Sequence, residues 1–426
     1  MSGAASAAGA RAAADHEELG LGHVLAAAAV GAGLTLADPG PVGSGSVLSD
    51  AQARRAAQAW GIAQSAPTVL VLVDGLGLEQ LLERRGHAPT LRAWLAGAQA
   101  DGRDPRLSTC LPSTTAAAIT TLGTTAPPGA TGMVGYSVLS PLLGPSLPAG
   151  TVPHPDQLLS LIAWQGAGLD PRAWQDVPCV FERLRTEPQA EPPDEPLAVS
   201  IGPARFAGSG LTEAGLRGAR HVGADRLENR PALAARALRQ GAPLVYLYVG
   251  ELDHAGHLHG WRSPQWLTRL EHLDAAMADL ERRVPPGTRI ILTADHGMVD
   301  TDASHRIDLS AEPDLARGIV AVAGEPRFTH LHVADSDPDL AERVAKRYRQ
   351  ALGDRAAWVG TREQVGALMG PLGERARGVV GDVVVVMDGA WVLVDPRVHA
   401  PAAIAMPGVH GGLTRAETGI PLLIAG

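Results

Sequence analysis

The sequence has little cysteine, one lysine and no excess of positive charge. Cys110 and Cys179 are its two cysteines, and they form no CxxC pair, which argues against a disulfide framework. Lys346 is the single lysine, and with Ala and Gly so abundant we interpret this as an effect of base composition. Acidic residues number 45 against 36 basic ones, a net charge of −9. A nucleic-acid-binding surface is therefore not expected.

Long apolar runs are also missing. The apolar segment 24–36 is shorter than the roughly 20 residues that a membrane-spanning helix needs. Asp15, Glu17 and Glu18 precede this segment where a secretory signal carries basic residues. We expect no membrane span, a cytoplasmic protein and disorder in residues 1–15. The sequence predicts no particular oligomeric state.

Three apolar segments, 68–73, 243–249 and 288–294, have the length of buried strands, and each is followed by ionisable residues. In open α/β sheets, ligands bind in the crevice beyond the carboxyl ends of the strands. Hydrophobic residues make up 45% of the 426 residues and charged residues 19%, an ordinary globular composition. We expect one domain over residues 1–426.

Carboxylates and imidazoles follow these three segments. Asp74 follows the first, and Asp295 and His296 follow the third. After the second, Asp253 and His257 are four residues apart, so on a helical turn both side chains face one way. Oxygen and nitrogen ligands of this kind suit zinc. Each residue alone also has a structural interpretation, such as a helix cap for Asp74 or an ordinary turn for Asp295 and His296.

Two further stretches add groups that suit the same chemistry. Ser113, Thr114 and Thr115 stand where a loop enters a predicted helix, so a hydroxyl there is either a cap or a nucleophile held in positive potential. His410 precedes Gly411 and Gly412 near the C-terminus, in a turn that would also suit a surface histidine.

Several carboxylates at one sheet edge repel one another unless cations neutralise them. Two zinc ions would do so. We assign one ion to Asp253, His257 and His410. The other ion is assigned to the remaining three residues, with the threonine oxygen between the two ions: Asp74, Asp295 and His296.

The order of these residues resembles the alkaline phosphatase superfamily, and within it the type I phosphodiesterase/nucleotide pyrophosphatase family. The similar segments are VDGLG (73–77), LPSTTAAAITTL (111–122), ELDHAGHLHG (251–260), TADHGMVD (293–300) and GVHGGLTRAE (408–417) with Pro421. The resemblance implies an α/β core with a central, mostly parallel sheet sandwiched by helices. It also implies a two-zinc site, a covalent phospho-threonine and a small phosphoester substrate, most naturally a nucleotide.

The resemblance selects Thr115 as nucleophile and metal ligand, because in this family that threonine lies nine residues before the threonine of a Thr-Gly pair. Thr115 lies nine before Thr124, and Thr114 is the reserve. The sequence departs from the family pattern at Thr125, where glycine is usual, and at Thr131, where histidine is usual. These departures weaken the assignment of the nucleophile more than that of the metal ligands.

Three rivals share parts of this pattern. Residues 110–114 resemble a sulfatase motif, but Thr114 replaces its arginine. A phosphonate or phosphomonoester hydrolase of the same superfamily would share the metal ligands. The absence of an arginine in the helix beside Thr115 favours diesters, since a dianionic monoester needs such a clamp. A non-catalytic metal- or nucleotide-binding protein would have the ligands without a working nucleophile.

The region 308–400 is predicted to form a small inserted subdomain. Within it, 383–387 and 391–394 joined by Asp388-Gly389 predict a β-hairpin. Glu325 and Arg327 are expected to form an exposed salt bridge, although a place in the lining of the site is an alternative.

Overall fold

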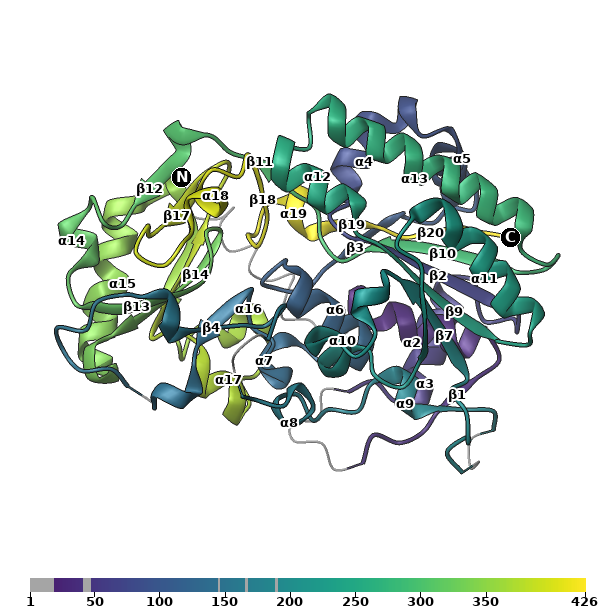
Figure 1. Cartoon of the computed structure of the whole chain (residues 1–426), viewed down its shortest axis with the longest axis horizontal. Coiled ribbons are helices and arrows are strands. Elements are labelled where there is room, and N and C mark those ends of the chain that lie inside the picture. Colours follow the sequence, from purple (N-terminus) through teal and green to yellow (C-terminus); the bar gives the residue numbers. More distant parts are fainter. Residues whose placement is uncertain (1–18, 41–46, 145, 165–167, 188–190) are drawn as a thin grey trace.

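A six-stranded sheet forms the core of the larger part of the molecule (Figure 1). The computed structural model describes residues 19–40, 47–144, 146–164, 168–187 and 191–426. The strand order is β20-β10-β2-β9-β7-β8, and every neighbouring pair is parallel except β10 with β20. The strands are β2 (Thr68–Val73), β7 (Ala198–Gly202), β8 (Arg220–Gly223), β9 (Leu244–Val249), β10 (Arg289–Ala294) and β20 (Leu423–Ala425).

The three apolar segments of the sequence are the three adjacent strands β10, β2 and β9 at the centre of this sheet. Every residue of β2 and β10 is buried. Strands covered on both faces need apolar side chains on both faces, which explains continuous apolar runs in place of alternation. The predicted mostly parallel central sheet is confirmed.

Helices cover both faces of the sheet (Figure 1). One face carries α5 (Pro89–Ala100), α11 (Arg230–Arg239) and α13 (Pro264–Arg283), and α12 (Glu251–His259) packs on α13. The other face carries α2 (Leu21–Gly31), with α3 (Asp50–Ala59) and α6 (Thr115–Thr124) packed on α2. The apolar segment 24–36 therefore supplies a buried helix. Within the described ranges, no helix is long and apolar enough to cross a membrane.

A second, antiparallel sheet forms the core of the smaller part of the molecule, with strand order β13-β14-β16-β15. Its strands are β13 (Ile319–Glu325), β14 (Phe328–Val333), β15 (Ala356–Thr361) and β16 (Val383–Met387). Leu331, Val333 and Val383 on one face pack on Val344 and Tyr348 of α15 (Pro338–Leu352). Phe328, Val384 and Val386 on the other face join an apolar cluster with residues of α16 (Gly366–Met369) and α17 (Glu374–Val379).

The predicted hairpin of residues 383–394 is wrong. Strand β16 pairs with β14 and β15, whereas β17 (Val392–Val394) pairs in parallel with β12 (Arg306–Asp308). In a hairpin, two strands that are consecutive in the sequence pair with each other. Here each of the two valine-rich strands pairs with strands that are more distant in the sequence. The inserted subdomain at residues 308–400 stays a prediction. The disorder expected of residues 1–15 concerns residues that lie outside the described part of the chain.

Short strands connect the C-terminal segment to the larger sheet and to the start of α6. β19 (Gly419–Pro421) pairs with β3 (Arg106–Ser108), and β18 (Gly408–Val409) pairs with β11 (Val299–Asp300). An isolated bridge between Ser113 and Gly411 continues the pairing of β3 with β19, so residues 106–113 and 411–421 run side by side. The Thr109 hydroxyl donates to the carbonyl oxygen of Asp295, which places this pair of segments beside the end of β10. The remaining short elements include α4 (Leu78–Arg84), α7 (Pro128–Thr131), α10 (Gly210–Gly215), β4 (Ser137–Leu139), β5 (Leu158–Ser160) and α19 (Arg415–Thr418).

Candidate metal centre

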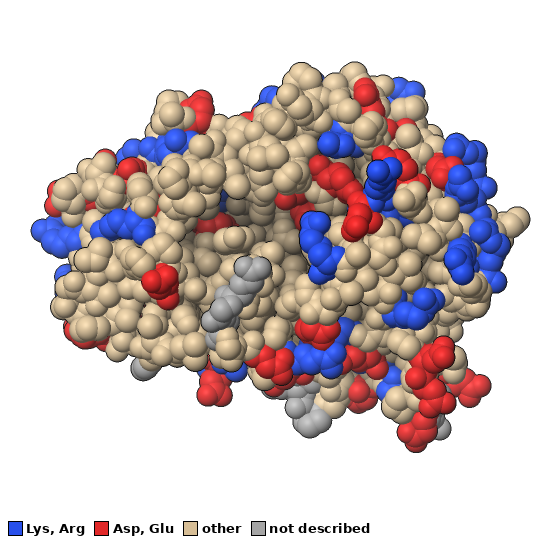
Figure 2. Space-filling view, in the orientation of Figure 1, with Lys and Arg blue, Asp and Glu red and all other residues tan. Residues whose placement is uncertain are grey.

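Asp74 and Asp295 come directly after the last residues of β2 and β10. Val73 is in register with Ala294 on one side and with Val249 on the other. These three neighbouring strands therefore end at the same edge of the sheet. Their common end brings the carboxylates of Asp74 and Asp295 together and places α12, which follows β9, beside them. Figure 2 shows acidic atoms in the hollow between the two parts of the molecule.

Asp295 is held by backbone amides. Its Oδ1 accepts hydrogen bonds from the amides of Gly75 (3.2 Å) and His296 (2.9 Å). Its Oδ2 is 3.4 Å from His296 Nε2. The two amides fix the carboxylate so that only Oδ2 faces the centre of the site.

Asp74 is fixed by a tyrosine. The Tyr248 hydroxyl, at the end of β9, donates a hydrogen bond to Asp74 Oδ2 at 2.5 Å. Asp74 Oδ1 points the other way and is 3.5 Å from His296 Nε2. Because Tyr248 occupies Oδ2, only Oδ1 of Asp74 is available to bind a cation.

Glycine is required where these turns approach other backbone. Gly75 has φ +74°, and a Cβ there would lie 2.9 Å from Asp253 Cα. A Cβ on Gly297 would lie 2.0 Å from the Ala416 carbonyl oxygen. The close packing of these turns is what brings Asp253 of α12 and the 408–417 segment up to Asp74 and Asp295.

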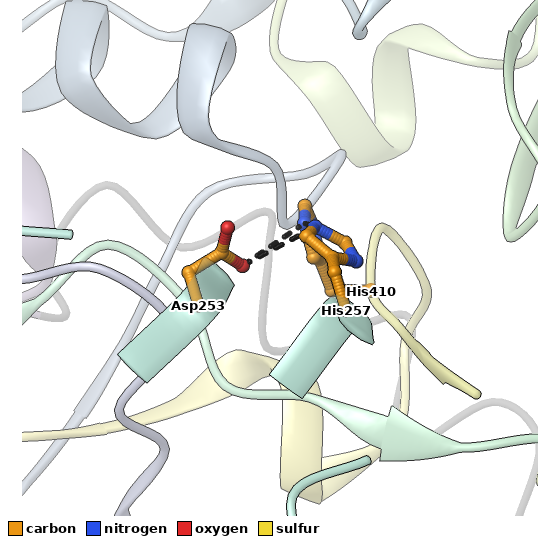
Figure 3. Close-up of side chains that lie close together, drawn as sticks. All are labelled: Asp253, His257 and His410. Carbon is orange, nitrogen blue, oxygen red and sulfur yellow. Dashed lines mark hydrogen bonds and ion pairs between the residues drawn. The ribbon is translucent and has the colours of Figure 1, made fainter. Parts of the chain in front are cut away.

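Asp253, His257 and His410 form a second cluster beside the first (Figure 3). Asp253 and His257 project from α12, and His410 comes from the segment after β18. Asp253 Oδ1 is 3.4 Å from His257 Nε2 and 3.6 Å from His410 Nε2. The carboxylate of Asp253 also groups with Asp74 and His296, so it lies between the two clusters.

Each of the three histidines has its Nδ1 next to a backbone carbonyl oxygen. The partners are Gly408 for His257 (2.9 Å), Gly297 for His296 (3.0 Å) and Ser113 for His410 (3.1 Å). Because a carbonyl oxygen only accepts, each Nδ1 carries the proton and each Nε2 presents a lone pair to the centre. This is the orientation that metal-binding histidines take in proteins.

The atoms that face the centre repel one another. His257 Nε2 and His410 Nε2 are 3.2 Å apart. Among the described residues, Asp74 Oδ1, Asp253 Oδ1 and Asp295 Oδ2 are buried without a hydrogen-bond partner. Burial, and then the nearby Asp295 and Asp253, raise the pKa of Asp74. Burial also raises the pKa of Asp295.

Burial, and then the neighbouring His296 and His257, lower the pKa of His410. Lone pairs and carboxylates collected in this way are stable only with positive charge between them. Oxygen and nitrogen donors of this number fit two divalent cations such as zinc.

The threonine chosen from the sequence reaches this centre. Thr115 is the first residue of α6, and its Oγ1 is 3.2 Å from His296 Nε2. Thr114 is the N-cap residue, but its side chain makes no capping hydrogen bond, and it is buried. The hydroxyl of Thr115 is the one of the two that faces the cation donors.

The structure brings together all seven residues predicted for the site. It differs in one respect, because Asp253, assigned to one ion only, is also close to Asp74 and His296. His254 and His259 of α12 are exposed. Asp74 does not cap α4, which has Gly77 as its N-cap residue.

The expectation for Glu325 and Arg327 is wrong: both side chains are buried, and Arg327 pairs with Glu417. Sequence reasoning also missed Tyr248. Strand β9 carries two tyrosines, Tyr246 and Tyr248, among aliphatic residues, and the usual preference of a tyrosine hydroxyl for a hydrogen-bond partner was the available signal.

Comparisons with known proteins bear on the family and the fold. The family model described as type I phosphodiesterase/nucleotide pyrophosphatase matches residues 68–412. Among curated proteins, no sequence relative is found. Phosphonoacetate hydrolase from Sinorhizobium meliloti 1021, in complex with phosphonoformate, is similar in structure with a TM-score of 0.61 at 18% identity, covering 84% of this chain and 89% of that chain.

Two ectonucleotide pyrophosphatase/phosphodiesterase 5 structures are also similar. The inactive murine protein in complex with AMP has a TM-score of 0.55 at 15% identity, covering 84% of this chain and 87% of that chain. The human protein has a TM-score of 0.58 at 16% identity, covering 84% and 88%. At these identities the similarity establishes a shared fold.

Proposed function

Because the chain belongs to the type I phosphodiesterase/nucleotide pyrophosphatase family and is a hydrolase acting on phosphoester bonds, we propose that it cleaves a nucleotide phosphodiester or pyrophosphate. The reaction would proceed through a phospho-threonine on Thr115 at a two-zinc site. The observation that carries this proposal is the gathering of six cation donors at one site, with the hydroxyl of Thr115 3.2 Å from His296 Nε2 of that site.

The donors divide between two ions as their positions suggest. Asp253, His257 and His410 would hold one ion. Asp74, Asp295 and His296 would hold the other together with Thr115 Oγ1, and Asp253 lies between the two sets. When bound, such a pair of ions lowers the pKa of the attacking hydroxyl and stabilises negative charge on the leaving oxygen.

Residues of the chain supply position and further stabilisation. α6 holds Thr115 at its first position, so the first backbone amides of the helix point toward the phosphoryl oxygens of a bound substrate. Thr115 Oγ1 would form the bond to phosphorus as the bond to the leaving oxygen breaks, and water would then hydrolyse the phospho-threonine.

A diester is favoured over a monoester by the charges of the helix. α6 carries no arginine or lysine along residues 115–124. A dianionic monoester is normally held by a bidentate guanidinium, so this helix suits a monoanionic diester better. The AMP complex of the similar murine protein supports a nucleotide as the substrate class.

The test is hydrolysis of bis-p-nitrophenyl phosphate beside p-nitrophenyl phosphate and phosphonoacetate, with and without zinc. The variants are Thr115→Ala and its matched neighbour Thr114→Ala. We expect zinc-dependent preference for the diester, lost in Thr115→Ala and retained in Thr114→Ala. Because Thr115 is part of the chemistry and Thr114 is not, this pair also tests the assignment of the nucleophile.

Other outcomes would replace the proposal. Preference for p-nitrophenyl phosphate would indicate a phosphomonoesterase. Turnover of phosphonoacetate alone would indicate a phosphonate hydrolase, which the same ligand set would serve. Zinc binding without turnover of any of the three would indicate a non-catalytic binding protein.

A further inference from the structure

The tip of the β13–β14 hairpin reaches from the second sheet to the segment that carries His410. Glu325 pairs with Phe328 across the turn, and Arg327 lies at its tip. The Arg327 side chain is fully buried. Its Nη1 donates to the carbonyl oxygens of Trp391 (2.6 Å) and Asp388 (3.3 Å). The hairpin tip and the turn of residues 388–391 therefore meet at one guanidinium that solvent does not reach.

The other side of the guanidinium makes a bidentate pair with Glu417. Arg327 Nε donates to Glu417 Oε1 at 2.9 Å, and Nη2 donates to Oε2 at 2.6 Å. Glu417 also accepts from the Gly412 amide (2.8 Å) and from the Thr414 hydroxyl (2.6 Å). One carboxylate thus closes the loop between Gly412 and Glu417 and attaches it to the second sheet.

This loop is continuous with the metal centre. The Ser113 hydroxyl donates to the Gly412 carbonyl oxygen (2.8 Å), and the Ser113 amide donates to Gly411 (3.3 Å). The Ser113 carbonyl oxygen in turn accepts from His410 Nδ1 (3.1 Å). The contacts run without a break from Arg327 through Glu417 and Gly412 to the imidazole of His410, and to the residue two before Thr115.

We propose that Arg327 and Glu417 are positioning residues that hold His410 opposite Asp253 and His257. The inference rests on the proposed function, because that function places a cation opposite His410. A buried ion pair adds little net stability compared with apolar residues of similar volume, so its value here is geometric. The pairing of β18 with β11 fixes the chain before His410. After His410, Gly411 and Gly412 contribute no side chains, so Glu417, which accepts from the Gly412 amide, fixes the chain on that side.

The chain offers a matched control pair. Arg362 Nη2 donates to Asp382 Oδ1 at 2.7 Å, and Asp382 also accepts from the Val333 amide. This pair joins the same sheet at the far end of β14, about 20 Å from Arg327 for a six-residue strand. It is likewise an arginine–carboxylate pair, with a buried Asp382 and a partly exposed Arg362, and it has no contact with residues 410–417 among its described partners.

The experiment measures zinc binding to the metal-free protein by competition with a chromophoric chelator, alongside thermal unfolding. The double variant Arg327→Met/Glu417→Gln removes both charges and leaves no unpaired ion. We expect it to bind one zinc ion as the wild type does and the second about 10- to 100-fold more weakly, the usual effect of losing an outer partner of a metal ligand. Arg362→Met/Asp382→Asn should lower the unfolding temperature and keep both affinities.

A conservative variant separates the two sets of contacts. Arg327→Lys keeps the charge opposite Glu417 but cannot also reach the Asp388 and Trp391 carbonyls, so it should bind both ions as the wild type does. If the double variant does not fold, Ser113→Ala carries the same expectation, because it breaks the link from the Ser113 hydroxyl to Gly412 and leaves the buried ion pair intact.

Unchanged affinity for both ions in Arg327→Met/Glu417→Gln, whatever its unfolding temperature, would overturn the inference. A wild-type protein that binds no zinc would instead refute the proposed function, so the two failures are distinct.

Discussion

The two halves of the metal centre differ in burial and in how the chain builds them. In the half made by Asp74, Asp295 and His296, the side chains are at most 5% exposed. In the half made by Asp253, His257 and His410, they are 10–25% exposed. We call these the strand-end half and the open half.

The strand-end half is fixed by the sheet itself. Asp74 and Asp295 directly follow two paired strands, and His296 comes after Asp295. Backbone amides hold the carboxylate of Asp295, and Tyr248 holds that of Asp74. The open half combines a helix with a segment 153 residues further along the chain, and depends on tertiary contacts. We therefore expect the strand-end half to bind its cation more tightly, at a larger cost to the stability of the metal-free protein.

The largest expected effect comes from removing one carboxylate charge in each half. Asp295→Asn and Asp253→Asn should both lower kcat/KM for the diester by about 10³-fold or more, because each loss weakens cation binding worth several kcal/mol in the transition state. Their effects on the metal-free protein should differ. Burial raises the pKa of Asp295, so at pH 7 its replacement should raise the unfolding temperature of the metal-free protein.

Asp253→Asn should stabilise the metal-free protein less, because this carboxylate retains some solvent. Thermal unfolding in chelator compares the two variants directly. An equal gain for both would show that the two halves do not differ in their burial cost.

Replacing a histidine in the open half should remove one ion and leave the other. His410→Asn is expected to reduce zinc from two ions to one per chain and to lower activity by about 10²-fold or more. Elemental analysis after dialysis gives the stoichiometry. Loss of both ions in His410→Asn would mean that the strand-end half does not bind independently.

A smaller effect is expected from the tyrosine behind Asp74. Tyr248→Phe removes the hydrogen bond to Asp74 Oδ2 and nothing that faces the open half. The affinity for one ion should fall about 10- to 100-fold, and the affinity for the other should be unchanged. A chelator titration that resolves two affinities measures this; a shift in both, or in neither, contradicts the role given to Tyr248.

The smallest expected effect is on stability, through Glu325, which packs against Gly411 beside His410. Burial raises the pKa of Glu325 to about 8. The folded protein then binds this proton more tightly than the unfolded chain does. Its contribution to stability is complete below the usual glutamate range, about pH 4.5, and is lost as pH rises through about 8.

Glu325→Gln removes this titration. Between pH 6 and 8 the metal-free wild type should lose up to about 2 kcal/mol, a few degrees in unfolding temperature, that the variant does not lose. If the unfolding temperatures of the wild type and the variant change with pH by the same amount, the carboxyl is not buried as described.

The sequence predicted the strand-end half well because its signals are local. A fully buried parallel strand is a continuous apolar run, and the carboxylate that follows it must lie at the sheet edge, as Asp74 and Asp295 do. The i, i+4 spacing of Asp253 and His257 is equally local, and α12 confirms it. His410 needed the family resemblance, because nothing near it in sequence indicates which element it will face.

The second sheet was predicted less well, for a physical reason. Valine-rich runs such as 383–387 fit any strand, and their partners are chosen by packing over long sequence separations. The position of Arg327 was missed in the same way. An arginine and a glutamate two residues apart suggest a surface pair, whereas its true partner, Glu417, lies 90 residues away and is buried.

The most direct test of the two-cation centre is anomalous diffraction at the zinc edge from crystals of the zinc-loaded protein. We expect two peaks, one among Asp74, Asp295, His296 and Thr115, and one among Asp253, His257 and His410. A single peak between the two halves, or zinc bound elsewhere with these side chains arranged as they are here, would contradict it.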